Sequence, residues 1–264
     1  MNFLLNIIQK SGDKTIMFWR SIAAFAAYNV SIVRSLKSMP YLRLRAIYDI
    51  VINQMYFTGF YSLPFVIITA LIIGGTVIVQ SFGSLPKFGI EGFLGNLMVI
   101  IISREAGPLI TALIVITRSG SAIASEIAAQ KQNGEIRAFE IMGIDIRLYI
   151  IVPRIIAFLL TLLSLIIIFN IVAFAGGYII ALFVHHIPLS TFALALIDAL
   201  TVKDLASMLT KSLIFGISIP VICCYHGLRP KSSFEIPIFV SKAVIHSLFS
   251  IIIINAAISL LFYL

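Results

Sequence analysis

Charged side chains are scarce in this sequence. Asp, Glu, Lys and Arg make up 11% of its 264 residues, whereas hydrophobic types make up 60%, and the mean hydropathy is +1.09. A typical soluble domain carries about 25% charged residues, so this composition excludes an ordinary soluble protein and predicts an integral membrane protein. The net charge of +8 comes from basic residues scattered between apolar runs, which argues against a partner of nucleic acid.

The sequence patterns of many enzymes and metalloproteins are missing too. No Gly-Lys dipeptide occurs, so no Walker-type phosphate loop can form, and neither HExxH nor GxSxG is present. The four histidines lie on different segments without a carboxylate at ligand spacing, and the two cysteines, Cys223 and Cys224, are adjacent. We therefore expect no metal site, no cofactor and no enzymatic activity in this chain, and free thiols at both cysteines. If ATP drives the protein, another subunit binds it.

Five apolar segments are long enough to cross a bilayer, which requires ~20 apolar residues in a helix. They cover about residues 60–79, 97–129, 149–184, 207–225 and 243–264. Between them, residues 185–211 read as a re-entrant or surface segment and residues 229–242 as a polar loop. The sequence thus predicts an all-α membrane protein whose transmembrane domain occupies residues 56–264.

Residues 1–55 are predicted to form a separate helical region that is cytoplasmic or lies at the membrane interface. Along residues 15–34, polar and apolar side chains separate onto two faces at the helical period, which favours an amphipathic helix lying in the membrane interface. A sixth, poorly apolar spanning helix is the alternative. Residues 39–54 carry too many charges to span and read as a polar connector or a second surface helix.

The arginines and lysines predict the orientation of the chain, because short cytoplasmic loops collect them. Fourteen lie before the first span and around the second-to-third and fourth-to-fifth loops, and three lie in the other two loops. This asymmetry predicts a cytoplasmic N-terminus and a C-terminus on the opposite, periplasmic side.

The second span carries ionisable residues inside an apolar run. Arg104 and Glu105 lie about seven residues, or about 10 Å, into it, and Arg118 follows. Such residues are costly in a membrane and usually functional, so we favour a polar point in an internal cavity over a purely structural bridge and take Arg104 and Glu105 as candidate substrate-binding residues. The small residues from Gly120 to Ala128 favour close helix packing over a serine-protease site.

Residues 131–147 form the only substantial polar segment between spans. Within it, Glu135 to Met142 predicts a two-turn helix that Gly143 closes at its C-terminal end.

The run REAGPLITALIVITRSGSAIASEIAAQ, followed by GEIRAFEIMG, resembles the MlaE/YrbE family of ABC-transporter permeases, which work with MCE-domain proteins in lipid traffic across the bacterial envelope. The resemblance implies five spans after an interfacial helix, a homodimer with a lipid cavity at its centre, and a functional Arg-Glu pair at Arg104 and Glu105. It also implies a place in the cell inner membrane and, as partners, a cytoplasmic ATPase, a periplasmic MCE-domain protein, a phospholipid or related lipid, and often a STAS-domain protein.

In the same family, the segment matching Gly134 to Gly143 is the coupling helix that contacts the ATPase, and we expect this contact to be made through Ile136, Phe139 and Met142. The residues implied here are Glu135, Ile136, Arg137, Ala138, Phe139, Glu140, Met142 and Gly143. Gly134, Arg137 and Phe139 depart from the family's usual Glu, Asp and Leu, which alters the charge contacts with the ATPase. The rival interpretations are a self-sufficient ion- or proton-coupled secondary transporter or channel, and a scaffolding membrane protein. Neither the lipid nor the direction of transport follows from the sequence.

Overall fold

The computed structural model describes residues 44–84 and 91–264. The predicted interfacial helix over residues 15–34 lies outside this range. Within the described residues every regular element is helical, and five helices are long and apolar enough to cross a membrane, together with a shorter apolar helix. The predicted all-α fold with five long apolar helices is therefore confirmed.

The first candidate span is Tyr48–Phe82. It lies within a continuous helix made of α2 (Leu44–Met55), the π-helical turn η2 (Tyr56–Phe60) and α3 (Tyr61–Ser84). The sequence-based assignment of residues 39–54 as a connector or separate surface helix is thus wrong from Leu44 onward. Val51 of α2 packs against Ala157 of α8, whereas Asp49 stays exposed. The charge on this segment therefore does not interrupt the helix, because it lies on the side that is not packed.

The second candidate span is Gly95–Gln132. It lies in a continuous helix that contains two π-helical segments. It runs through α4 (Glu91–Met98), η3 (Val99–Ala106), α5 (Gly107–Val115), η4 (Ile116–Gly120) and α6 (Ser121–Gln132), where η3 and η4 are π-helical. Single π-helical turns inside α-helices often mark functional sites. Here one of them carries Arg104 and Glu105, and the other carries Arg118.

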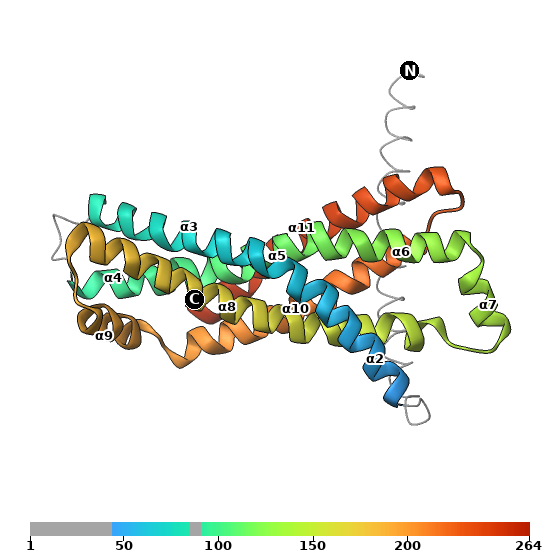
Figure 1. Cartoon of the computed structure of the whole chain (residues 1–264), viewed down its shortest axis with the longest axis horizontal. Coiled ribbons are helices and arrows are strands. Elements are labelled where there is room, and N and C mark those ends of the chain that lie inside the picture. Colours follow the sequence, from blue (N-terminus) through green and yellow to red (C-terminus); the bar gives the residue numbers. More distant parts are fainter. Residues whose placement is uncertain (1–43, 85–90) are drawn as a thin grey trace, which may run out of the picture.

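A short helix follows, α7 (Glu135–Ile141), which leads into η5 (Arg147–Ile151) and the long α8 (Val152–His185). Beyond it lie α9 (Leu189–Ala199), α10 (Val202–Gly227), the 3-10 turn η6 (Ser233–Glu235) and α11 (Ile236–Tyr263). The long helices run side by side along the long axis of the molecule, with α7 at one end and α9 at the other (Figure 1).

Two segments predicted as non-spanning contribute to spans instead. Residues 185–211 contain α9 and the first turns of α10, which begins at Val202 because Thr201 and Asp204 form a capping box. Residues 229–242 are helical from Ile236, with a proline in the first turn of α11. The fourth and fifth long helices therefore start earlier than their apolar runs, at Val202 and Ser233.

Close packing of helix backbones holds the bundle together. A Cβ atom built on Gly74 of α3 would lie 1.9 Å from the carbonyl oxygen of Ala173 in α8, and one on Gly216 of α10 would lie 2.8 Å from the Cα of Leu159 in α8. Only glycine permits these contacts. Large side chains of α8 and α10, including Phe158, Phe169 and Phe215, are fully buried between the helices.

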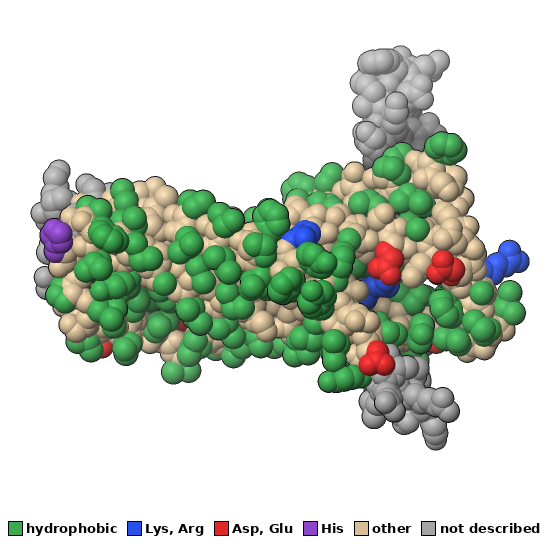
Figure 2. Space-filling model, viewed as in Figure 1, with side chains coloured by type: hydrophobic (Ala, Val, Ile, Leu, Met, Phe, Trp, Pro, Cys, Tyr) green, Lys and Arg blue, Asp and Glu red, His purple; other side chains and the backbone are tan. Residues whose placement is uncertain are grey.

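The outer surface is apolar along most of its length. Figure 2 shows hydrophobic side chains over much of the visible face, while the Lys, Arg, Asp and Glu side chains on that face gather toward the α7 end. Exposed isoleucines and leucines occur on the long helices, for example Ile68, Ile72, Ile253 and Leu261. A surface of this kind suits contact with lipid and not with water.

Candidate functional site

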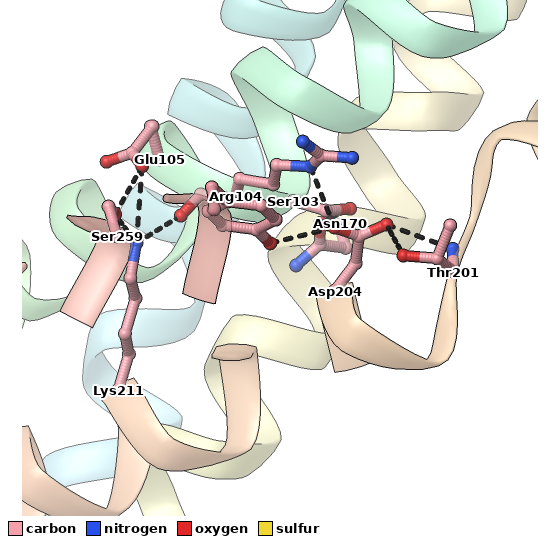
Figure 3. Close-up of polar contacts among 9 residues, drawn as sticks. Ser103, Arg104, Glu105, Asn170, Thr201, Asp204, Lys211 and Ser259 are labelled. Carbon is pink, nitrogen blue, oxygen red and sulfur yellow. Dashed lines mark hydrogen bonds and ion pairs between the residues drawn. The ribbon is translucent and has the colours of Figure 1, made fainter. Parts of the chain in front are cut away.

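Three consecutive residues of η3 each contact a different part of the bundle. Ser103 donates a 2.7 Å hydrogen bond to Oδ1 of Asn170 in α8, Arg104 points toward α10, and Glu105 points toward α10 and α11 (Figure 3). Neighbours on a helix point about 100° apart, so one turn can distribute three polar groups over three surrounding helices. The sequence-predicted pair therefore does not pair with itself.

Arg104 forms an ion pair with Asp204 at the start of α10. Its Nε atom lies 2.7 Å from Oδ1 of Asp204, and its guanidinium lies 4.3 Å from the ring centroid of Tyr263. The Asp204 carboxylate also accepts hydrogen bonds from the Thr201 backbone N–H and hydroxyl, at 2.9 and 2.7 Å, and from the Tyr263 hydroxyl at 2.7 Å. Four groups thus fix a carboxylate whose side chain is 1% exposed.

Glu105 is held by a second set of partners on α10 and α11. Its carboxylate accepts hydrogen bonds from Asn255 Nδ2 at 2.6 Å and from the Ser259 hydroxyl at 2.5 Å, and Lys211 Nζ lies 3.4 Å away. Lys211 itself is fully buried, and it also donates to Ser259 at 2.7 Å and to the backbone carbonyl of Arg104 at 2.5 Å.

The bond from Lys211 to a backbone carbonyl has a local cause. Pro108 has no N–H and so cannot make the α-helical hydrogen bond to the carbonyl of Arg104 four residues earlier. Lys211 supplies a charged donor in its place. The ammonium group therefore neutralises Glu105 and completes the hydrogen bonding of the helix backbone at the same point.

The two ion pairs are asymmetric in exposure. The Asp204 and Lys211 side chains are 1% and 0% exposed, whereas the Arg104 and Glu105 side chains are 23% and 43% exposed. The inner members are thus enclosed by protein, and the outer members still present polar surface. This arrangement presents one fixed cation and one fixed anion on consecutive residues of η3.

Sequence reasoning missed the partners of this polar network. Asp204 and Lys211 lie in the segment that was predicted to be re-entrant or on the surface, and Asn170, Asn255, Ser259 and Tyr263 lie in apolar runs. The available signal was the spacing of Asp204 and Lys211, which lie seven residues apart and so share one face of α10. Their charges complement the adjacent charges of Arg104 and Glu105.

The predicted coupling segment forms α7, which glycines delimit at both ends. Gly134 and Gly143 have φ angles of 78° and 72°, a region that favours glycine. After Met142, the Gly143 N–H bonds to the Glu140 carbonyl and the Ile144 N–H to the Phe139 carbonyl, which is a Schellman motif. The helix ends at Ile141, one residue before the predicted end.

The apolar face of α7 turns toward its own chain. Ile136 is buried, and the Phe139 ring lies 5.4 Å from that of Tyr149. Ile141 and Met142 are 79% and 61% exposed. Ile136 and Phe139, which we expect to contact the ATPase, thus pack against their own chain and anchor α7, and Ile141 and Met142 are its most accessible apolar residues. Glu135, Arg137, Ala138 and Glu140 are exposed or nearly so.

The remaining candidate residues lie near the α7 end of α10 and α11. Cys223 and Cys224 are buried free thiols, as predicted. His226 and His246, which the sequence placed on separate segments, come together with their Nε2 and Nδ1 atoms 2.8 Å apart. Among the residues that the structure describes, no group of three or more metal-ligating side chains occurs.

These features define a multi-pass helical membrane protein with a charged network enclosed in its bundle, as in membrane permeases. The family model described as "Permease MlaE" matches residues 51–261. A probable ABC transporter permease protein of Rickettsia bellii is 30% identical over 261 residues, covering 98% of this chain and 99% of the relative. The chain therefore belongs to the MlaE permease family.

Two more distant relatives carry more specific names. The intermembrane phospholipid transport system permease protein MlaE of Haemophilus influenzae is 25% identical over 227 residues, covering 85% of this chain and 84% of the relative. The chloroplastic protein TRIGALACTOSYLDIACYLGLYCEROL 1 of Arabidopsis thaliana is 26% identical over 246 residues, covering 93% of this chain and 69% of the relative. As an ABC-transporter permease subunit, the chain is not itself an enzyme and works with a separate ATPase.

Proposed function

We propose that this chain is the permease subunit of an ABC transporter that moves phospholipid, or a related lipid, between the inner membrane and the periplasm or outer membrane. Membership of the MlaE family and the name of the Haemophilus influenzae relative support this transport role. The observation that carries the proposal is the pair of partly exposed, oppositely charged side chains, Arg104 and Glu105, which buried partners hold in place within a membrane bundle.

In the proposed mechanism, the Arg104 guanidinium binds the phosphate of a lipid headgroup. A guanidinium donates well to phosphate oxygens because its planar N–H groups match their geometry. Glu105 accepts from the amine or hydroxyl groups of the headgroup, and the acyl chains lie along the apolar helix surfaces. Asp204 and Lys211 keep both side chains oriented between transport cycles, which lowers the cost of ordering them when a lipid binds.

Coupling to the ATPase is proposed to occur through α7. Its anchored face, with Ile136 and Phe139, fixes the helix on the permease. Ile141 and Met142 project from its C-terminal end and fit an apolar groove on the ATPase, while Glu135, Arg137 and Glu140 supply charged contacts at the rim. Gly134 and Gly143 then act as the points where the helix joins the spans.

The assembly is proposed to contain two copies of this chain, with the lipid cavity between them. A periplasmic MCE-domain protein receives or delivers the lipid, and a STAS-domain protein binds on the cytoplasmic side. The chain lies in the inner membrane with a cytoplasmic N-terminus and a periplasmic C-terminus. The distribution of arginine and lysine supports this orientation, which places α7 on the same side as the ATPase.

The experiment compares Glu105→Gln and Glu105→Arg complexes with the wild type after purification in mild detergent. Glu105→Arg puts a third cation beside Arg104 and Lys211 and should reduce both bound phospholipid and ATP-driven transfer between vesicles more than Glu105→Gln, by about tenfold or more against about threefold. Asp198→Asn, which neutralises an exposed carboxylate on α9, serves as the matched control.

Assembly with the ATPase is scored on the same samples. Wild-type lipid content and transfer in both Glu105 variants would remove the pair from the substrate path, and failure to assemble would assign it a structural role. Lipid or ion movement by the permease without its ATPase would favour the rival secondary transporter.

A further inference from the structure

The π-helical turn η4 carries Arg118, a cation that has no anionic partner within the described residues. Arg118 is half-buried, and its Nη1 atom is buried without a hydrogen-bond partner. Its guanidinium lies between two rings of α3, 5.2 Å from the centroid of Tyr61 and 5.2 Å from that of Phe65. Every other membrane-embedded cation described above, Arg104 and Lys211, has a carboxylate within 4 Å.

Tyr61, one of the two rings beside this arginine, belongs to an exposed cluster of aromatic rings. Tyr56 and Phe60 stack with centroids 5.1 Å apart, and Tyr61 meets both rings edge-on at about 6 Å. The members are 44% to 59% exposed: Tyr56, Phe57, Phe60, Tyr61 and Phe65. Aromatic side chains concentrate at the headgroup level of membranes, so anchoring in the interface explains the rings. It does not explain the arginine.

The position of Arg118 along its helix agrees with headgroup depth. Glu126 lies eight residues beyond it, about 12 Å at helical rise, and Lys131 follows near the α7 end of the bundle. Arg118 thus lies about 12 Å inside the charged end of its helix and level with Tyr61 and Phe65, at the start of the apolar run of residues 60–79. A phosphate of a membrane lipid reaches this level, and the rings flank the upper part of its acyl chains.

We infer that Arg118, Tyr61 and Phe65 form a phospholipid headgroup site in the leaflet on the α7 side, separate from Arg104 and Glu105, with the guanidinium bound to the lipid phosphate. Burial of Nη1 without a partner leaves an N–H group whose hydrogen bond a phosphate oxygen would supply. The Tyr61 and Phe65 rings flank the guanidinium and leave its N–H edge available to the ligand. The inference rests on the proposed function only in placing the chain in a phospholipid bilayer.

The test uses a phosphatidylglycerol analogue that carries a photoreactive diazirine beside its headgroup, added to the purified full-length permease with its ATPase. Cross-links in the wild type should map to residues 56–65. Arg118→Gln should reduce their yield about tenfold, and Arg118→Lys about threefold, because lysine keeps the charge but not the stacked plane. A diacylglycerol analogue with the same diazirine but no phosphate should label the wild type only at the Arg118→Gln level.

Arg229→Gln is the matched control, since Arg229 also stacks on a tyrosine, Tyr225, at the same end of the bundle. It should leave cross-linking at residues 56–65 unchanged. Should Arg118→Gln fail to assemble, Phe65→Leu tests the same site by removing one flanking ring and should lower the yield about threefold.

Three results would overturn the inference: wild-type cross-linking in Arg118→Gln, equal labelling by the phosphate-free analogue, or loss of cross-linking on addition of inorganic phosphate, which would identify a free-anion site. Absence of cross-links in the wild type, with loss of a co-purifying protein in Arg118→Gln, would assign the arginine to a carboxylate of a partner protein. None of these results bears on Glu105, whose variants report on transport separately.

Discussion

The η3 polar network and α7 both carry charged side chains, but they use them in opposite ways. In η3, Arg104 and Glu105 are held by partners from α10 and α11, and the inner members are almost completely enclosed. In α7, the apolar side chains provide the anchoring, and most charged side chains face outward. Charge buried in the bundle thus determines how the helices fit together, whereas charge on α7 is available to another subunit.

The largest effect on stability is expected at Lys211. Lys211→Met leaves the Glu105 carboxylate without its cation and the Arg104 carbonyl without its donor, and it should lower the free energy of unfolding by about 2–4 kcal/mol. Thermal unfolding of the purified permease in one detergent measures this change. Lys203→Met, an exposed lysine on the same helix, controls for the loss of a positive charge.

A second variant at the same site separates the pair from general damage. Combining Lys211→Met with Glu105→Gln should recover part of the lost stability, since no buried charge then remains without a partner. An unfolding midpoint unchanged from the wild type in the single variant would show that the network does not hold the bundle together.

An intermediate effect is expected at the C-terminal end of α7. Gly143 has a φ angle of 72°, and no atom lies within 4 Å of a Cβ built there. Gly143→Ala should therefore cost about 1 kcal/mol from backbone strain alone, and Gly143→Asn less, because asparagine tolerates this conformation better. Equal unfolding midpoints for alanine and asparagine would argue that the loop changes conformation on substitution.

The smallest effect on stability and a large effect on coupling are expected at Ile141. Its side chain is 79% exposed, so Ile141→Asp should change the free energy of unfolding by less than about 0.5 kcal/mol. If the exposed end of α7 fits the ATPase, the same change should reduce lipid-stimulated ATP hydrolysis at least tenfold. Arg147→Gln, at an exposed position after α7, is the control. Normal coupling in Ile141→Asp would leave α7 as a connector.

The sequence predicted the number of long helices because the length of an apolar run is a local property. It placed Arg104 and Glu105 correctly inside the second of them for the same reason. The ends of the helices were predicted less accurately, since Asp204 lies in the segment predicted to be re-entrant or on the surface, whereas it forms the capping box of α10 with Thr201 and binds Arg104. Polar residues at the ends of apolar runs were assigned to loops, but in the structure they belong to helices.

The partners of the pair could not be predicted from one sequence. Arg104 and Asp204 are a hundred residues apart, and their contact depends on how three helices align lengthwise, which no local pattern encodes. The sequence did not show which side chains of α7 face inward, for a different reason. A helix of seven residues is too short to display a period, so the inward positions of Ile136 and Phe139 could not be told from the outward position of Ile141.

The glycine contacts described in the fold limit how this bundle can change shape. Because Gly74 lets α3 touch the backbone of α8, and Gly216 lets α10 do the same, relative sliding would drive main-chain atoms into one another. We therefore expect these three helices to keep their relative positions. α11 contains no glycine and rests on its neighbours through side chains, which can change rotamers. We therefore expect any relative movement of helices during transport to be smaller at the α3–α8 and α8–α10 contacts than at α11, the helix that carries Asn255, Ser259 and Tyr263.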